Sequence, residues 1–189
     1  MHEPSEAGAF SAADRGALAD AGWLLARLPA GLTLAGLRAD GAPFKGTRYF
    51  ERHAAATVEQ TTIATDLAYR PALLPGSLNL TYPATEALVA EMTAALPPSL
   101  VATIAPAAAY VWLFEHHRAT HGAYPFAQRY TWAVDRYQEQ AHLVLGVFGQ
   151  QRPLIVAPQV EGHGSGVGVW PLVVPRAVLP RLWPPAVTG

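Results

Sequence analysis

The sequence predicts a closed β-barrel decorated with helices, and three observations support this fold class. Most of the chain after residue 99 consists of short apolar runs separated by proline, glycine or glutamine-rich breaks, which is typical of strands joined by close turns. These runs do not alternate with helices, as a parallel α/β sheet requires. We find no internal repeat and no linker, so we expect an N-terminal helical extension at residues 1–30 and a single barrel domain at residues 31–189.

Length and composition limit the function classes. The chain has 189 residues, enough for one domain with one core. Its N-terminus is acidic and lacks a secretion signal, and no apolar run reaches the roughly eighteen residues of a membrane span, so we expect a cytoplasmic protein without a membrane partner. The net charge of −1 gives no electrostatic footprint for nucleic acid. Cysteine is absent, so a metal would need histidine, carboxylate or neutral oxygen ligands.

The first elements are predicted from capping and turn residues. Residues 11–28 read as a helix with Ser11 as its N-cap and Asp14 at the third position, ending at Pro29. Residues 32–36 then favour a strand, residues 38–47 a glycine-containing loop, and residues 48–50 the start of another strand.

The segment at residues 74–80, Leu-Pro-Gly-Ser-Leu-Asn-Leu, is the most informative one. A Pro-Gly turn runs into a predicted strand that carries Ser77 and Asn79 on one face, while Leu78 and Leu80 point into the core. Two side-chain oxygens on one face suit a hydrated Mg²⁺ or a phosphate. The alternative is that they only face solvent on an edge strand.

The remaining elements follow the same signals. A second helix is predicted from Pro83, at its first turn, to the prolines at residues 97 and 98. A last short helix is expected from Pro175. The strands between them are expected at residues 101–104, 110–114, 130–134, 142–148, 154–157 and 167–174.

Three segments follow one another along the chain. They are the glycine-containing loop and aromatic strand at 41–50, the Pro-Gly-Ser-Leu-Asn turn at 74–80, and an apolar strand at 154–158 followed by His163 and the Pro-containing run at 172–179. In this order they resemble the CTP-dependent riboflavin kinases of archaea. The resemblance spans residues 34–182 with an insertion in the middle. That family folds as a cradle-loop β-barrel, so the resemblance implies a barrel of the cradle-loop type.

The resemblance also implies a site for phosphoryl transfer from CTP to riboflavin or a flavin-like acceptor. Ser77 and Asn79 would hold the Mg²⁺ that bridges the phosphates and the acceptor hydroxyl. The phosphates would be cradled by a nucleotide-binding loop made of Lys45, Gly46, Thr47 and Arg48.

The chain also departs from the family. Its loop lacks the family's acidic residue, and Pro171 stands where a carboxylate is expected, so the general base is unassigned. Glu161 and His163 lie nearby in the sequence and are the candidates for this catalytic role. The competing hypothesis is a small-molecule-binding barrel that has lost catalysis.

A histidine-rich segment at residues 115–121 offers a possible metal site. In a helix, His117 and His121 would share one face, with Glu115 or His142 completing the ligands. We read the segment as strand and loop, in which case His116, His117 and His121 form only a polar rim.

A further resemblance is to acetoacetate decarboxylase-like proteins, through residues 136–144 with 87–88 and 96–100. Those enzymes need a buried lysine that forms a Schiff base. The one lysine, Lys45, lies far upstream, so a lysine-free relative that binds a small organic acid is the form of this hypothesis that remains. Alternatively, Tyr137 and Glu139 form a strand face that pairs with Arg136 or Arg129.

Overall fold

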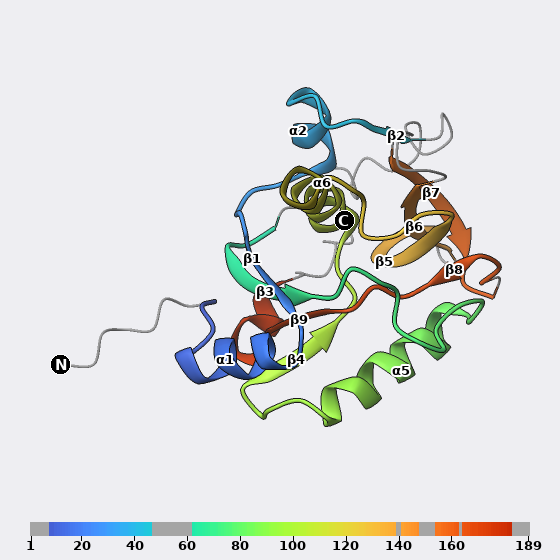
Figure 1. The fold of residues 1–189 in the computed structure, drawn as a ribbon. Coiled ribbons are helices and arrows are strands. Elements are labelled where there is room, and N and C mark those ends of the chain that lie inside the picture. The colour runs from blue at the N-terminus through green and yellow to red at the C-terminus, as the bar shows by residue number, and fades with distance from the viewer. Residues whose placement is uncertain (1–7, 47–61, 139–140, 148–153, 163, 183–189) are drawn as a thin grey trace.

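The fold is mixed α/β, with its strands in two separate sheets (Figure 1). The computed structural model describes residues 8–46, 62–138, 141–147, 154–162 and 164–182. Within these residues neither sheet closes on itself, because the strands at the edges of each sheet do not pair with each other. The predicted closed β-barrel of the cradle-loop type is therefore wrong.

The first sheet is antiparallel throughout. Its four described strands lie in the order β1 (Leu24–Leu28), β3 (Thr65–Tyr69), β9 (Leu172–Pro175) and β4 (Leu100–Thr103).

The second sheet is antiparallel at its centre and parallel at both edges. Its five described strands lie in the order β2 (Phe44–Gly46), β7 (Leu154–Val160), β6 (Ala141–Val147), β5 (Arg129–Gln138) and β8 (Val167–Gly168). The short strands β2 and β8 thus occupy opposite edges, and three strands separate them.

Helices fill the space between the sheets and cover their ends. The described helices are α1 (Ala12–Asp20), α2 (Leu34–Ala39), α5 (Tyr82–Ala94), α6 (Ala107–His121), η1 (Arg176–Val178) and α7 (Leu179–Leu182). Figure 1 shows α6 almost end-on between the two sheets, with α1 and α5 toward the other end of the molecule. No helix of the described ranges is both long and apolar enough to cross a membrane.

The largest error of the sequence analysis concerns α6, since residues 110–114 were expected to form a strand. The first eight residues of α6 except Trp112 are buried, so the helix has no polar stripe in this part. A short run that is apolar on every side reads equally well as a buried strand. Helical periodicity was therefore not visible here.

The N-terminal half is partly as predicted. Ser11 caps α1, its hydroxyl accepting a hydrogen bond from the Asp14 N–H at 3.0 Å. The helix ends at Asp20 because Gly22 has a positive φ of 78°, so the predicted helix over 24–28 is wrong and these residues form β1. The predicted strand at 32–36 is also wrong, because Thr33 caps α2. The helix predicted from Pro83 is confirmed as α5.

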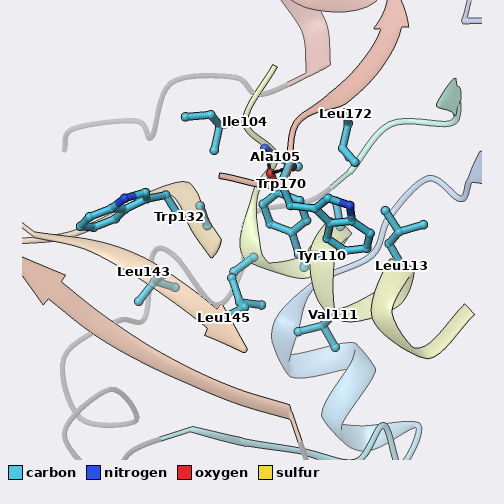
Figure 2. Packing of buried hydrophobic residues seen from close by; sticks show 14 of the residues in the cluster. Ile104, Ala105, Tyr110, Val111, Leu113, Trp132, Leu143, Leu145, Trp170 and Leu172 are labelled. Atoms are coloured by element: carbon cyan, nitrogen blue, oxygen red, sulfur yellow. Dashed lines mark hydrogen bonds between the residues drawn. The ribbon is translucent and has the colours of Figure 1, made fainter. Parts of the chain in front are cut away.

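The core is centred on aromatic residues that lie against α6. The Tyr110 and Trp170 rings stack at 5.7 Å, and both are fully buried. Figure 2 shows the two hydrogen bonds of the Tyr110 hydroxyl, which accepts from the Ala105 N–H at 3.1 Å and donates to the Trp170 carbonyl at 2.6 Å. The tyrosine thus keeps its polar atom paired while it fixes the start of α6 to the strand region that precedes β9.

Candidate functional site

Ser77 lies in a turn rather than on the predicted strand, and Leu78 points outward instead of into the core. The prediction of a strand here is wrong. The buried Ser77 hydroxyl donates to the Leu74 carbonyl at 2.7 Å and accepts from the Val169 N–H at 3.0 Å. Both bonds are to the backbone, so this hydroxyl fastens the turn to the segment after β8.

Asn79 has a similar role in the same turn. Its φ of 65° is in the left-handed region, which asparagine tolerates better than most residues. Its side-chain oxygen accepts a hydrogen bond from the Gly166 N–H at 2.8 Å, and its own N–H donates to the Val167 carbonyl at 2.8 Å. The oxygen atoms predicted to hold Mg²⁺ are therefore both engaged in holding two loops together.

The predicted nucleotide-binding loop lies elsewhere. Lys45 and Gly46 belong to β2, where Lys45 is exposed, whereas Ser77 and Asn79 contact β8 and its flanks at the opposite edge of the sheet. Four strand spacings of about 4.8 Å separate these edges, or about 19 Å. Outside the described residues lie three further predicted site residues: Thr47, Arg48 and His163. The described part of the predicted kinase site is thus not brought together.

The histidine-rich segment at residues 115–121 is part of α6, so the expected strand and loop is wrong. His117 and His121 therefore share one face of a helix. The rings of His117 and His121 lie 4.4 Å apart on α6. His117 Nδ1, however, lies 3.1 Å from the Tyr69 hydroxyl, and Glu115 forms an ion pair with Arg118 at 2.7 Å. In the described part of the chain, no group of three histidines or carboxylates could hold a metal ion.

Glu161 belongs to a set of interacting side chains that we call the polar cluster: Tyr82, Glu86, Arg136, His142 and Glu161. Secondary structure places them together. Arg136 on β5 and His142 on β6 are cross-strand partners, and Glu161 follows the end of β7, the next strand. The Tyr82 N–H donates to the Glu161 carbonyl at 3.1 Å, so the start of α5 is joined to the end of β7.

His142 and Glu161 form the buried part of this cluster. The His142 ring stacks on Tyr82 with centroids 3.6 Å apart, and its Nδ1 lies 3.2 Å from the Ala133 carbonyl. A carbonyl only accepts, so Nδ1 carries a proton. His142 Nε2 lies 3.0 Å from Glu161 Oε1, and a contact this short needs one proton between the two atoms.

Burial has the largest effect on the ionisation of the cluster. It lowers the pKa of His142, and the Ala133 hydrogen bond and the Glu161 charge offset this only in part. Burial also raises the pKa of Glu86, and the negative charge of Glu161 raises it further against the opposing effects of Arg136 and the Tyr82 hydroxyl. Two carboxyl groups thus compete for one nearby guanidinium.

A groove of about 350 Å³ opens beside the polar cluster, between α5, β4, β5 and α7. Tyr82 and Glu86 line one part of it. Most of the remaining lining is apolar: Val89, Ala90, Val101, Ala102, Ile104, Val134 and Leu179. The Thr93 hydroxyl fixes the wall of the groove, because it accepts from the Ala102 N–H at 3.0 Å and donates to the Val89 carbonyl at 3.1 Å. An apolar cleft with a few polar groups is the usual form of a small-molecule site.

Sequence reasoning identified Glu161 but missed its partners. Tyr82 and Glu86 were not singled out. The helix was predicted from Pro83, and only the observed start of α5 at Tyr82 places the two residues one turn apart, a spacing at which side chains meet. His142 was considered only as a metal ligand. Its pairing with Glu161 depends on the register of β6 and β7, which the sequence pattern does not determine.

Comparisons with known proteins do not identify a family. No family model matches the chain, and searches of curated proteins and of solved structures find no significant match. The resemblance to decarboxylases gains no support from the site, because Lys45 is exposed at a sheet edge rather than buried. The function is therefore argued from the site itself.

Proposed function

We propose that this protein binds a small molecule that has a protonated amine and an apolar body, and that the groove beside the polar cluster is its site. The observation that carries this proposal is the position of Glu86. It is the acidic residue of the groove lining, and it lies within electrostatic range of the second carboxylate, Glu161.

The charges of the cluster favour a cation. The proton between His142 and Glu161 leaves that pair without net charge. Once this proton is lost, Glu86 and Glu161 carry two negative charges against the positive charge of Arg136 within the described polar cluster. The Arg136 guanidinium lies 3.8 Å from Glu161 Oε1 and is mostly exposed, so it neutralises the pair incompletely. A protonated amine at Glu86 would relieve the repulsion between the carboxylates and gain a charge-assisted hydrogen bond.

The rest of the groove lining is mostly apolar and would contact the apolar part of the ligand. Val89 on α5 and Val101 on β4 are buried lining residues, and Leu179 on α7 is a partly exposed one. Covering Leu179, which is 36% exposed, removes most of this apolar area from water, because Val89 and Val101 are only 6% exposed. Such burial is worth about 25 cal/mol per Å². The ligand class is therefore an amphiphilic amine rather than a metal ion or a sugar.

The His142–Glu161 pair supports the site from behind. Because His142 is stacked under Tyr82 and joined to Glu161, it holds both groups in fixed positions next to Glu86. A cation bound at Glu86 would favour loss of the proton that His142 and Glu161 share. We therefore expect binding to release protons, and the observed enthalpy to depend on the ionisation enthalpy of the buffer.

Calorimetric titration of the whole chain with hexylamine, hexan-1-ol and hexanoate tests the proposal. Hexylamine should bind most tightly, and Glu86→Gln should weaken it by roughly tenfold or more, since it removes a charged partner. Glu91→Gln is the matched control, because Glu91 is an exposed glutamate of the same helix outside the groove lining. Equal affinity for the amine and the alcohol, or an equal effect of the two substitutions, contradicts the proposal.

A further inference from the structure

A second hollow lies on the other flank of α5 and is independent of the polar cluster. It has a volume of about 460 Å³ and is bounded by the ends of α1 and α5, the segment after β3 and the residue before β9. Its walls include Trp23, Leu73, Leu74, Met92 and Leu96, all partly buried. A large apolar surface is therefore still open to a ligand.

Arg70 is the charged residue of this lining. Its guanidinium lies over the Trp23 ring, 4.8 Å from the centroid, and one Nη donates to the Ala21 carbonyl at 2.8 Å. These contacts hold the group in place but use only part of its five donors. Within the described residues, no carboxylate lies within ion-pair distance of Arg70, so among these residues no acidic side chain occupies its remaining donors.

The wall that carries Arg70 is fixed before any ligand enters. The Arg70 carbonyl accepts a hydrogen bond from the indole N–H of the fully buried Trp170 at 2.5 Å, and a second from the Ala72 N–H at 2.8 Å. Four residues on, the Leu74 N–H donates to the Val169 carbonyl at 2.8 Å. A preformed site loses little conformational entropy on binding, which favours affinity.

We infer that this hollow, the Arg70 pocket, binds a small amphiphile with an apolar chain and a carboxylate head. The carboxylate pairs with the free donors of Arg70, whose planar fork matches its two oxygens. The apolar chain of the ligand lies against Met92, Leu96 and Leu73. This site is separate from the groove at Glu86, and it selects a ligand of opposite charge.

Calorimetric titration of the whole chain with decanoate, below its micelle concentration, is the direct test, with decan-1-ol and decyltrimethylammonium as probes of the same chain length. Decanoate should bind most tightly. Arg70→Gln should weaken the binding of decanoate by about tenfold or more and leave the binding of decan-1-ol nearly unchanged, because only the charged head contacts the guanidinium. Arg38→Gln is the matched control, since Arg38 is also an exposed arginine over an aromatic ring, that of Phe44.

A second variant tests where the alkyl chain of the ligand lies and leaves Arg70 unchanged. Ala95→Phe adds bulk to an exposed lining residue and should weaken decanoate and decan-1-ol alike. Thermal unfolding confirms that each variant is folded. Arg70→Gln protein that binds decanoate as tightly as the wild type, or Ala95→Phe protein that binds both probes normally, overturns the inference. Neither substitution should change hexylamine binding, so the inference stands or falls independently of the groove.

Discussion

The groove and the Arg70 pocket lie on two flanks of one helix and differ mainly in charge. Along α5, Val89 and Thr93 line the groove, whereas Met92 lines the pocket together with Leu96 just beyond the helix end. Each of these pairs is four residues apart, so the helix presents two adjacent rows of side chains, one to each hollow. The charged lining residue is a carboxylate in one hollow and a guanidinium in the other. One helix thus borders two hollows whose charged lining residues have opposite signs.

Reversing the charge of each hollow should have the largest effect. Glu86→Arg places a second guanidinium near Arg136, and Arg70→Glu places a carboxylate against the carboxylate of decanoate. Since like charges in contact cost several kcal/mol, each change should reduce binding of the matching probe by more than about a hundredfold. Calorimetry with hexylamine and decanoate on both variants measures this.

Each reversal should leave the other hollow unaffected. If Glu86→Arg weakened decanoate, or Arg70→Glu weakened hexylamine, the two hollows would be coupled and the comparison between them would fail. If one variant lost binding of both probes and also had a lowered melting temperature, this would indicate damage to the fold instead.

Removing the hydroxyl that fastens each wall should have an intermediate effect. Ser77→Ala leaves the buried Val169 N–H without its acceptor, so we expect a loss of about 1–3 kcal/mol in the free energy of unfolding. The same change loosens the turn that follows Leu74, and decanoate should bind more weakly. Urea denaturation and calorimetry give the two values.

Thr93→Val is the matched change on the other flank, because it removes the acceptor of the Ala102 N–H. It should destabilise the protein by a similar amount and weaken hexylamine rather than decanoate. This pair also tests the metal hypothesis. If Ser77 held Mg²⁺, the wild type would gain thermal stability from added Mg²⁺ and Ser77→Ala would not.

The smallest expected effect is the pH dependence of the two affinities. Glu86 binds a cation only when ionised, and its pKa is raised. Hexylamine affinity should therefore increase by a few-fold as the pH rises through a range above the usual one for glutamate, since the amine itself stays protonated. The pH dependence of decanoate affinity should not involve Glu86, because Glu86 does not line the Arg70 pocket. Glu86→Gln should remove the rise.

The stability of the fold has its own pH dependence, which these titrations must account for. Burial raises the pKa of Asp135 to about 7, against the hydrogen bond that its carboxylate accepts from the Ala107 N–H. The folded state thus binds a proton more tightly than the unfolded state, so this group's contribution to stability is full below the unfolded pKa and declines as the pH rises toward about 7. Melting curves at each pH separate this effect from ligand binding.

Local signals predicted the elements that have caps and one polar side. Ser11 marks the start of α1, and Pro83 marks the first turn of α5, because capping chemistry is encoded within a few residues. The strands β4 and β6 were also placed within one residue at each end from their apolar runs, whereas the predictions for β5 and β7 began within one residue of the observed start but ended too early. The start of α6 was not, because a helix buried on all sides shows no periodicity. The open sheets were mistaken for a barrel because strand order depends on contacts between distant segments.

The candidate site shows the same contrast between what local sequence predicts and what depends on contacts between distant segments. Glu161 was identified from its position near an apolar strand, but nothing local indicates that His142 lies 3.0 Å away. Arg70 carried no signal at all, since its role depends on Trp23, which is distant in the sequence. Ser77 and Asn79 were expected on one face of a strand as ligands, but they lie in turns and their oxygens accept from backbone N–H groups.

The contact between the turn at residues 77–80 and the loop before β8 restricts which sequences can form this fold. A Cβ atom at Gly164 would lie within 2.0 Å of the Leu80 carbonyl oxygen. Any other residue at this position would push the two loops apart and break the hydrogen bond between Asn79 and Gly166. Homologous chains should therefore retain glycine at position 164 and exchange residue 79 only together with the loop it binds, so this pair of positions is a practical marker for recognising distant relatives.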